Sequence, residues 1–161
     1  LAGAHHTLAE FHQVMERLVK MEDSQYSYRN TLLATNSEGI TAGIIVSYDG
    51  AQLKALRQRF IEEAKATFGI DYTGMDPETQ EGELYIDSLA VPAAFRGKGI
   101  AKMLLKAVIE KGREMGLPAV GLLVDKGNPK AERLYANMGF EYVNDAVWGG
   151  HSMKHLQYPL R

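Results

Sequence analysis

Residues 84–102 read LYIDSLAVPAAFRGKGIAK, and this stretch decides how the fold is interpreted. Residues 84–91 have the apolar pattern of a buried strand, and a helical pattern begins directly after Gly99. Backbone N–H groups at a helix start are unpaired and attract anions, and Gly97 and Gly99 allow the backbone to approach one closely. Three basic side chains add positive charge around this turn: Arg96, Lys98 and Lys102. The turn is therefore predicted to bind a pyrophosphate group.

Two better-known phosphate loops do not fit this turn. A Walker-type P-loop needs GxxxxGK followed by Ser or Thr, whereas the GK here is followed by Gly99 and Pro92 replaces the first glycine. The dinucleotide fingerprint GxGxxG needs a third glycine where Lys102 stands, and an acidic ribose ligand after a second strand. The pattern that remains is Arg96, two residues, Gly99, one residue and Ala101.

A second pattern lies in residues 128–140, which read NPKAERLYANMGF. Asn128 is a good helix N-cap, Pro129 suits the first helical position, and Gly139 is expected to end the helix. Four apolar side chains fall on one stripe at helical spacing: Ala131, Leu134, Tyr135 and Met138. By its spacing alone, Tyr135 would be a core aromatic side chain.

Together the two patterns resemble the GNAT superfamily of N-acetyltransferases, over about residues 84–140. In that family the acyl-CoA pyrophosphate binds a loop that reads Gln or Arg, two residues, Gly, one residue, then Gly or Ala. The family's later helix reads N-x-x-A-x-x-L-Y-x-x-x-G-F, and this chain matches every fixed position. The resemblance implies an N-acetyltransferase with acetyl-CoA as cosubstrate and no metal. A non-catalytic acyl-CoA sensor on the same fold is the alternative, and a nucleotide-phosphate enzyme is a further rival.

The resemblance also implies roles for single residues. The Tyr135 hydroxyl would protonate the departing CoA thiolate as general acid, and Asn128 would contact the pantetheine arm. The end of the predicted strand would give the thioester its backbone contacts, often at a bulge. The cofactor-binding set is accordingly predicted to be Leu89, Ala90, Val91, Arg96, Gly97, Lys98, Gly99, Ile100, Ala101, Lys102, Asn128 and Ala131.

The general base is the least defined part of the predicted site. Asp87 alternates with Leu89 along the strand, so it is expected on the same face as residues near the thioester. A half-buried carboxylate can be tuned for proton transfer. Glu83 or Tyr85, at the same parity, or a water molecule would be the alternatives.

The sequence does not identify the amine acceptor. Residues 71–87 lack lysine and arginine and carry six acidic side chains: Asp71, Asp76, Glu78, Glu81, Glu83 and Asp87. If this stretch rims the acceptor cleft it would attract a cationic amine, and a solvated acidic loop is the plainer alternative. A polyamine, an aminoglycoside, an amino acid, and a protein N-terminus or lysine all remain open.

Composition narrows the class of protein. A chain of 161 residues with 45% apolar and 24% charged side chains is expected to form a single domain over residues 1–161. The net charge of −2 argues against nucleic-acid or membrane-surface partners. The lack of cysteine excludes disulfides and thiolate zinc sites, and the five histidines, interpreted as surface or partly buried, lack ligand spacing. No membrane span or signal peptide is visible, so a cytoplasmic enzyme is expected.

Periodicity predicts an α/β fold. Helices are predicted at residues 8–19, 51–68, 100–115 and 128–138, and strands at 28–35, 40–48, 84–91, 119–124, 140–147 and 152–158. Core-facing positions are predicted at Leu8, Phe11, Val14 or Met15, and Leu18 of the first helix, and at Met103, Leu104, Ala107 and Val108 of the third. The resemblance implies a mixed, mostly antiparallel central sheet flanked by helices and splayed between its fourth and fifth strands.

Two further expectations follow from the resemblance. Nothing before Thr7 resembles the family's first strand, and the chain opens with Leu1 rather than Met. Either the beginning is missing from the printed sequence, or the fold is trimmed there. The family also suggests a homodimer formed through the hairpin of the last two strands.

Overall fold

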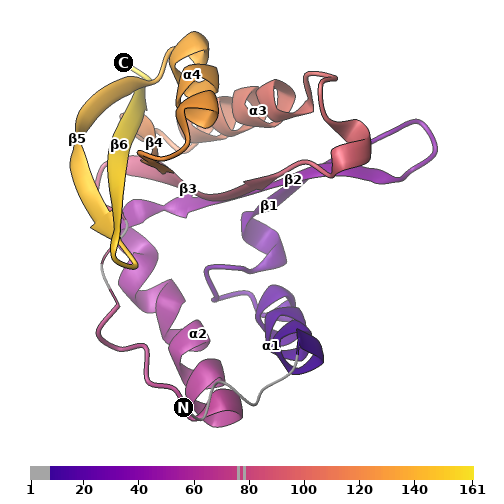
Figure 1. Cartoon of the computed structure of the whole chain (residues 1–161), viewed down its shortest axis with the longest axis vertical. Coiled ribbons are helices and arrows are strands. Elements are labelled where there is room, and N and C mark those ends of the chain that lie inside the picture. The colour runs from indigo at the N-terminus through magenta and orange to yellow at the C-terminus, as the bar shows by residue number, and fades with distance from the viewer. Residues whose placement is uncertain (1–7, 76, 78) are drawn as a thin grey trace. The chain divides into compact units, whose positions relative to one another are not determined.

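The computed structural model describes residues 8–75, 77 and 79–161 (Figure 1). The chain divides into two compact units, one of residues 1–31 and 52–75 and the other of residues 32–51 and 76–161. The single domain expected over residues 1–161 stays a prediction. Residues 1–7, where no first strand was expected, lie outside the described part of the chain. None of the described helices is long and apolar enough to cross a membrane.

The first unit contains two helices, α1 (Leu8–Lys20) and α2 (Leu53–Phe68). Val14 and Leu18 of α1 are fully buried, as is Ala64 of α2. The predicted inward positions Leu8 and Phe11 are instead 71% and 45% exposed. The prediction was wrong there because the buried stripe of α1 begins only at Val14, six positions after Leu8.

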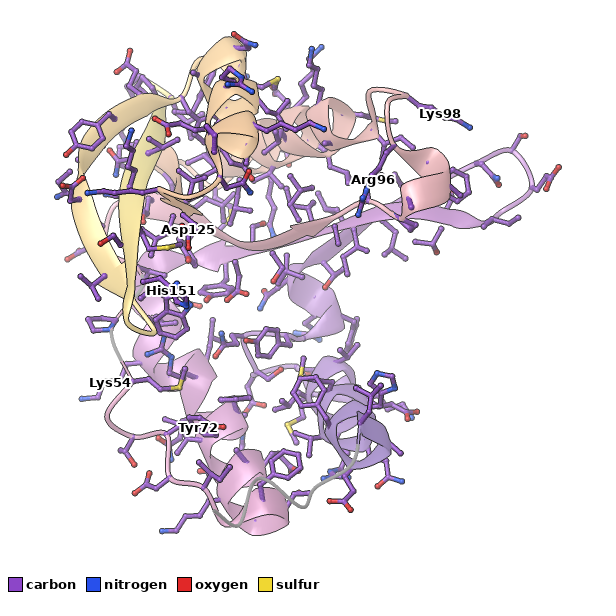
Figure 2. All side chains as sticks on the ribbon, viewed as in Figure 1. Lys54, Tyr72, Arg96, Lys98, Asp125 and His151 are labelled. Atoms are coloured by element: carbon purple, nitrogen blue, oxygen red, sulfur yellow. The ribbon has the colours of Figure 1, made fainter. Side chains whose placement is uncertain are left out.

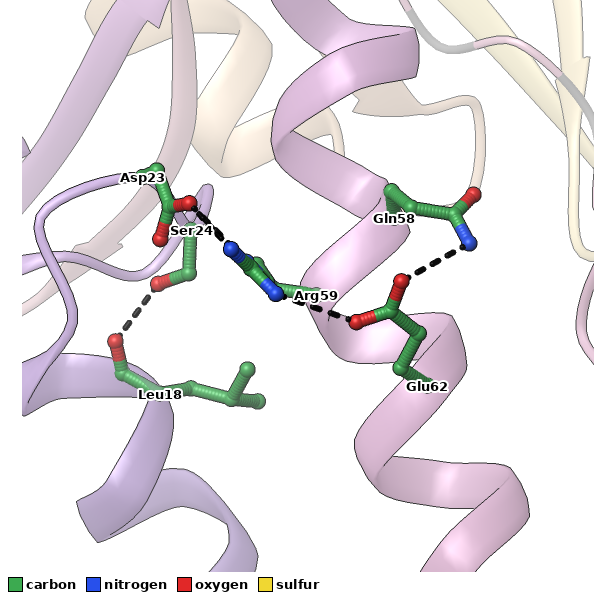
Figure 3. Close-up of polar contacts among 6 residues, drawn as sticks. All are labelled: Leu18, Asp23, Ser24, Gln58, Arg59 and Glu62. Atoms are coloured by element: carbon green, nitrogen blue, oxygen red, sulfur yellow. Dashed lines mark hydrogen bonds and ion pairs between the residues drawn. The ribbon is translucent and has the colours of Figure 1, made fainter.

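Polar contacts join the loop after α1 to α2 (Figure 3). Arg59 of α2 donates to the Oδ2 atom of Asp23 from Nη2 at 2.8 Å, and to Glu62 from Nη1 at 3.2 Å. The hydrogen bond with Arg59 lowers the pKa of Asp23. In the same loop, the buried Ser24 hydroxyl donates to the carbonyl oxygen of Leu18 at 2.5 Å. These contacts order the loop that leads into the sheet.

The second unit contains a six-stranded sheet with the order β1-β2-β3-β4-β6-β5. The strands are β1 (Thr31–Thr35), β2 (Thr41–Asp49), β3 (Glu83–Ala90), β4 (Ala119–Asp125), β5 (Glu141–Trp148) and β6 (His151–Pro159). β3 and β4 run parallel, while β2 with β3, β4 with β6, and β5 with β6 are antiparallel. The mostly antiparallel mixed sheet is confirmed. Residues 28–30, predicted as strand, form a short 3₁₀ turn because the Ser27 hydroxyl accepts the Arg29 N–H.

β3 and β4 separate halfway along their length. Their pairing runs from Glu83 with Ala119 to Ile86 with Leu122, although β3 continues to Ala90 and β4 to Asp125. The splay between these strands, the fourth and fifth of the family, is therefore confirmed. The pairing of β3 with β2 shifts at the same level, because Val46 pairs with Ser88 and Ser47 with Ile86. Asp87 is the extra residue of this bulge, and a bulge increases the local twist that parts two strands.

Two helices, α3 (Ile100–Glu114) and α4 (Pro129–Met138), cover one face of the sheet (Figure 1). The core between them and the sheet includes Leu84, Ile86, Val120 and Leu122 from the two central strands. From α3 the buried side chains are Ile100, Leu104, Leu105, Val108 and Ile109. Met103 and Ala107 are exposed, so half of the predicted stripe was wrong. The predicted stripe and the buried stripe both have helical spacing, so the spacing alone does not show which of them packs against the sheet.

The ends of α4 are as the sequence predicts. The Asn128 side-chain oxygen accepts the Ala131 N–H at 3.2 Å, and Pro129 stands in the first turn. Gly139 ends the helix in the left-handed conformation, with φ +108°. The N-terminus of α4 is thus fixed beside the end of β4, where the two parallel strands have already parted.

Candidate active site

The glycine turn leaves the N-terminus of α3 open to a ligand. Gly97 and Gly99 have φ values of +77° and +78°, which favour glycine over residues with a Cβ. Gly99 is the N-cap of α3 and has no side chain to accept the first N–H groups of the helix. These donors, together with the helix dipole, are suited to an anion such as a phosphate.

An open pocket of about 340 Å³ adjoins this turn. Seven of the predicted cofactor-binding residues line it: Val91, Arg96, Gly97, Gly99, Ile100, Ala101 and Lys102. Three more lining residues were not predicted, namely Phe95, Lys130 and Leu134. Lys130 and Leu134 lie one turn apart on α4, so placing the motif helix beside α3 would have found both. The pocket carries three cationic side chains, which suits a polyphosphate.

The basic residues of the turn are used in different ways (Figure 2). Arg96 Nε donates to the carbonyl oxygen of Val91 at 3.1 Å, which ties the turn to the end of β3. Lys98 does not line the pocket, and its Nζ lies 5.6 Å from the centre of the Phe95 ring. The positive charge at the pocket therefore comes from Arg96, Lys102 and Lys130.

Five residues of the predicted cofactor set do not line the pocket: Leu89, Ala90, Lys98, Asn128 and Ala131. Leu89 and Ala131 pack against the core, and Ala90 pairs with Ile44 of β2. Asn128 uses its side-chain oxygen as the cap of α4. The roles proposed for these residues toward a thioester or a pantetheine arm stay predictions.

Tyr135 is half-buried on α4, with its ring against that of Phe140. The two rings are T-shaped, with centroids 5.8 Å apart. The hydroxyl makes no hydrogen bond to any residue in the part of the chain described here. Burial raises the pKa of Tyr135, so the hydroxyl holds its proton at neutral pH. A group that gives a proton to a leaving thiolate must hold it in this way.

Asp87 lies in the β3 bulge with both carboxylate oxygens bonded. The Tyr48 hydroxyl donates to Oδ2 at 2.8 Å, and the Ser88 hydroxyl donates to Oδ1 at 2.9 Å. Asp87 does not share a face with Leu89, which packs into the core beneath α3 and α4. The predicted parity was wrong because the extra residue of the bulge reverses the alternation. Asp87 nevertheless stands at the level where β3 and β4 part.

The two alternative bases on β3 lie deeper in the sheet. Glu83 is completely buried at the paired end of the strand, four residues before Asp87. Its Oε2 atom accepts hydrogen bonds from His155 Nε2 at 2.7 Å and Gln157 Nε2 at 2.9 Å. The ring of Tyr85 is buried in T-shaped contact with Tyr48. Asp87 is therefore the β3 candidate that lies at the splay.

The histidines are placed in two different environments. His155 is only 4% exposed, which contradicts the prediction of a surface or partly buried side chain. Its burial follows from its hydrogen bond to Glu83, a partner 72 positions away. His151 is exposed, with Nδ1 3.6 Å from Asp125 Oδ2 (Figure 2). Asp76 and Glu78 of the acidic stretch lie outside the described residues.

Comparisons with known proteins point to one family. Residues 66–140 match the model of the acetyltransferase (GNAT) family. An acetyltransferase of Agrobacterium fabrum is 42% identical over 70 residues, which are 44% of this chain and 50% of the relative. A mycothiol acetyltransferase of Propionibacterium freudenreichii is 34% identical over 88 residues, or 53% of this chain and 28% of the relative. The match thus spans half or less of the length of these relatives.

Two solved structures have the same fold as this chain over nearly its whole length. A crystal structure of an acetyltransferase has a TM-score of 0.85 and 29% identity, with 98% of this chain and 84% of the other covered. An N-acetyltransferase from Staphylococcus aureus Mu50 has a TM-score of 0.80 and 27% identity, with 96% and 83% covered. With the splayed sheet, the glycine turn and the motif helix already in place, these matches lead to one conclusion. Residues 66–140 are similar to the GNAT family of acetyltransferases, and the chain has the fold of these solved acetyltransferases.

Proposed function

We propose that the protein transfers the acetyl group of acetyl-CoA to a primary amine. The observation that carries this proposal is the pocket beside the uncapped start of α3. Its N–H donors and the side chains of Arg96, Lys102 and Lys130 supply the hydrogen bonds and positive charge that a pyrophosphate needs. The thioester end would then lie toward the splay, where no strand pairing competes for the backbone of β3 beyond Ile86 on the β4 side.

The transfer exchanges one bond for another. The amine nitrogen attacks the thioester carbonyl carbon, a C–N bond forms, and the C–S bond breaks. The amine loses one proton and the thiolate gains one, so no oxidant or metal is required. In this scheme Asp87, directly or through water, accepts the proton of the amine. Tyr135 gives its proton to the leaving sulfur, and a backbone N–H at residues 89–91 stabilises the carbonyl oxygen as charge develops.

Asp87 is held in place for its proposed role. The hydroxyls of Tyr48 and Ser88 each donate to a different oxygen of the carboxylate. These two contacts fix the orientation of the carboxylate at the bulge. We therefore assign Tyr48 as a positioning residue and Asp87 as the base.

The proposal is tested by incubating the protein with acetyl-CoA and a panel of primary amines while free CoA thiol is measured. We expect thiol release with at least one amine. Tight binding of acetyl-CoA without transfer to any amine would favour the sensor alternative. Tighter binding of ATP than of acetyl-CoA in calorimetry would instead favour a nucleotide-phosphate enzyme. The homodimer, the cytoplasmic location and the lack of nucleic-acid or membrane partners remain predictions from the sequence.

A further inference from the structure

A second polar site lies on the sheet face opposite α3 and α4. Leu84 and Ile86 of β3 point into the core beneath these helices, so Glu83 and Tyr85 occupy the other face. On that face Gly121 of β4 pairs with Tyr85, and Gln157 of β6 pairs with Gly121. The Glu83 carboxylate of β3 thus meets the His155 imidazole and the Gln157 amide of β6 across Gly121 of β4.

The Glu83 carboxylate is buried on this face, and one of its two oxygens has no hydrogen-bond donor among the described residues. Oε2 accepts from His155 and Gln157, whereas Oε1 is buried and accepts no hydrogen bond from the described residues. A buried oxygen without a donor is costly, so this one calls for an explanation. Space for the carboxylate depends on Gly121, because a Cβ built there would overlap the Glu83 carboxyl group.

A small open pocket of about 90 Å³ adjoins the carboxylate. Its lining includes Thr79, Glu83, Leu123, Asn144 and His155. The Thr79 hydroxyl donates to the carbonyl oxygen of Gly50 at 2.5 Å, which fixes one wall. Another part of the lining is fixed by the pairing of Asn144 with His155 between β5 and β6. The pocket therefore has room for a group of a few heavy atoms and no more.

The charge in the lining selects the kind of group. Among the described residues that line the pocket, Glu83 is the acidic one and none is lysine or arginine. A carboxylate in such a lining attracts cations. The free carboxylate oxygen accepts hydrogen bonds only, and the neighbouring hydroxyl and amide also offer acceptors. A primary ammonium group has the charge, the three donors and the size that this environment calls for.

We propose that the Glu83 pocket binds the ammonium end of an alkylamine. The pocket is separate from the one beside the glycine turn, and it shares no lining residue with it. The bound nitrogen would donate toward the Glu83 carboxylate and toward the polar atoms of Asn144 and Thr79. The inference does not depend on acetyl transfer, because it concerns binding alone.

The test is an NMR titration of the wild-type protein with n-butylammonium chloride, with 1-butanol as the neutral control. We expect butylammonium to shift the resonances of Glu83, Asn144 and His155 in a saturable way, and butanol to leave them unchanged. Equal shifts with both compounds would show that the pocket does not select the ammonium group. Shifts confined to residues 96–102 would place the amine elsewhere. Either result would overturn the proposal.

Two variants separate the pocket from the general charge of the region. Glu83→Gln keeps the shape of the side chain and the acceptor for His155, but it removes the charge. Losing a charge-assisted hydrogen bond should weaken butylammonium binding about tenfold or more. Glu81→Gln removes the same charge from an exposed neighbour outside the pocket lining, and it should change affinity much less. Equal losses in the two variants would reduce the effect to non-specific attraction and contradict the proposal.

Discussion

Arg96 Nε donates a hydrogen bond to the carbonyl oxygen of Val91, with 3.1 Å between the two atoms. This contact joins the end of β3 to the turn before α3 and leaves both Nη groups free of hydrogen bonds to the described residues. Arg96 therefore closes the turn with one nitrogen and presents two more to the pocket that it lines. The strand end and the anion site act as one structural unit.

Replacing Arg96 with alanine should weaken acetyl-CoA binding. The variant loses a bidentate, charge-assisted contact to a pyrophosphate, which corresponds to a drop in affinity of about ten- to a hundredfold. Calorimetry with acetyl-CoA measures the effect. Arg96→Lys is the matched control, because it keeps the charge but not the planar fork, and its loss should be intermediate. Unchanged affinity in Arg96→Ala would remove the turn from the donor site.

Replacing Tyr135 with phenylalanine should lower kcat far more than it changes acetyl-CoA affinity. The ring packing against Phe140 is retained, while the proton for the thiolate is lost. General acid catalysis is worth roughly 10²- to 10⁴-fold, so a decrease in kcat within that range is expected. Full activity in this variant would exclude Tyr135 as the acid.

The pH dependence of the difference in kcat between the wild type and Tyr135→Phe follows from the burial of Tyr135. Burial raises the pKa of the hydroxyl, and the protonated form is the active one. Its contribution is therefore fully retained through the ordinary tyrosine pKa of about 10 and is lost only at higher pH. The ratio of wild-type to Tyr135→Phe kcat should be constant from about pH 7 to about pH 9. A ratio that falls within this range would show that the hydroxyl titrates too early to be a buried acid.

The assignment of Asp87 as base is tested by a pair of variants. Asp87→Asn removes the proton acceptor and should lower kcat by about 10²-fold or more. Tyr48→Phe removes only an orienting hydrogen bond and should have a smaller effect, about tenfold. Steady-state kinetics at saturating acetyl-CoA compares them. Equal kcat values for wild type and Asp87→Asn would show that Asp87 is not the general base and would favour water as the proton acceptor.

The glycine turn should be sensitive to a single methyl group. Gly99→Ala places a Cβ in open space but at a φ of +78°, which costs about 1–2 kcal/mol. For a chain of this size we expect the Tm to fall by roughly 2–8 °C. Gly74→Ala is the control, because Gly74 also faces open space and does not have a positive φ. Thermal unfolding that shows equal stability for both variants would contradict the assigned conformation.

Features set by neighbouring residues could be predicted from the sequence. The ends of α4 depend on Asn128, Pro129 and Gly139, which cap or stop a helix wherever they occur. The glycine turn is local in the same sense, and its two left-handed residues are both glycine. These local signals were sufficient to locate the pocket beside the glycine turn and seven of the ten residues that line it.

Features set by distant partners could not be predicted in this way. The bulge at Asp87 arises from the register of β3 against β2, so strict alternation misplaced Leu89. The burial of His155 depends on Glu83, and the burial of Glu83 depends on the missing side chain at Gly121. The core stripe of α3 was half wrong because two stripes with the same period differ only in what they pack against. Each of these errors concerns a contact between strands or between a helix and the sheet.

In the proposed reaction the glycine turn holds acetyl-CoA while a primary amine receives its acetyl group. The most direct measurement combines CoA thiol release with mass spectrometry of the amine, for wild type and Arg96→Ala at the same acetyl-CoA concentration. We expect equal amounts of CoA and acetylated amine with the wild type, and a much lower rate with the variant at subsaturating acetyl-CoA. Acetyl-CoA binding at the turn with no acetylated amine across the panel would contradict it.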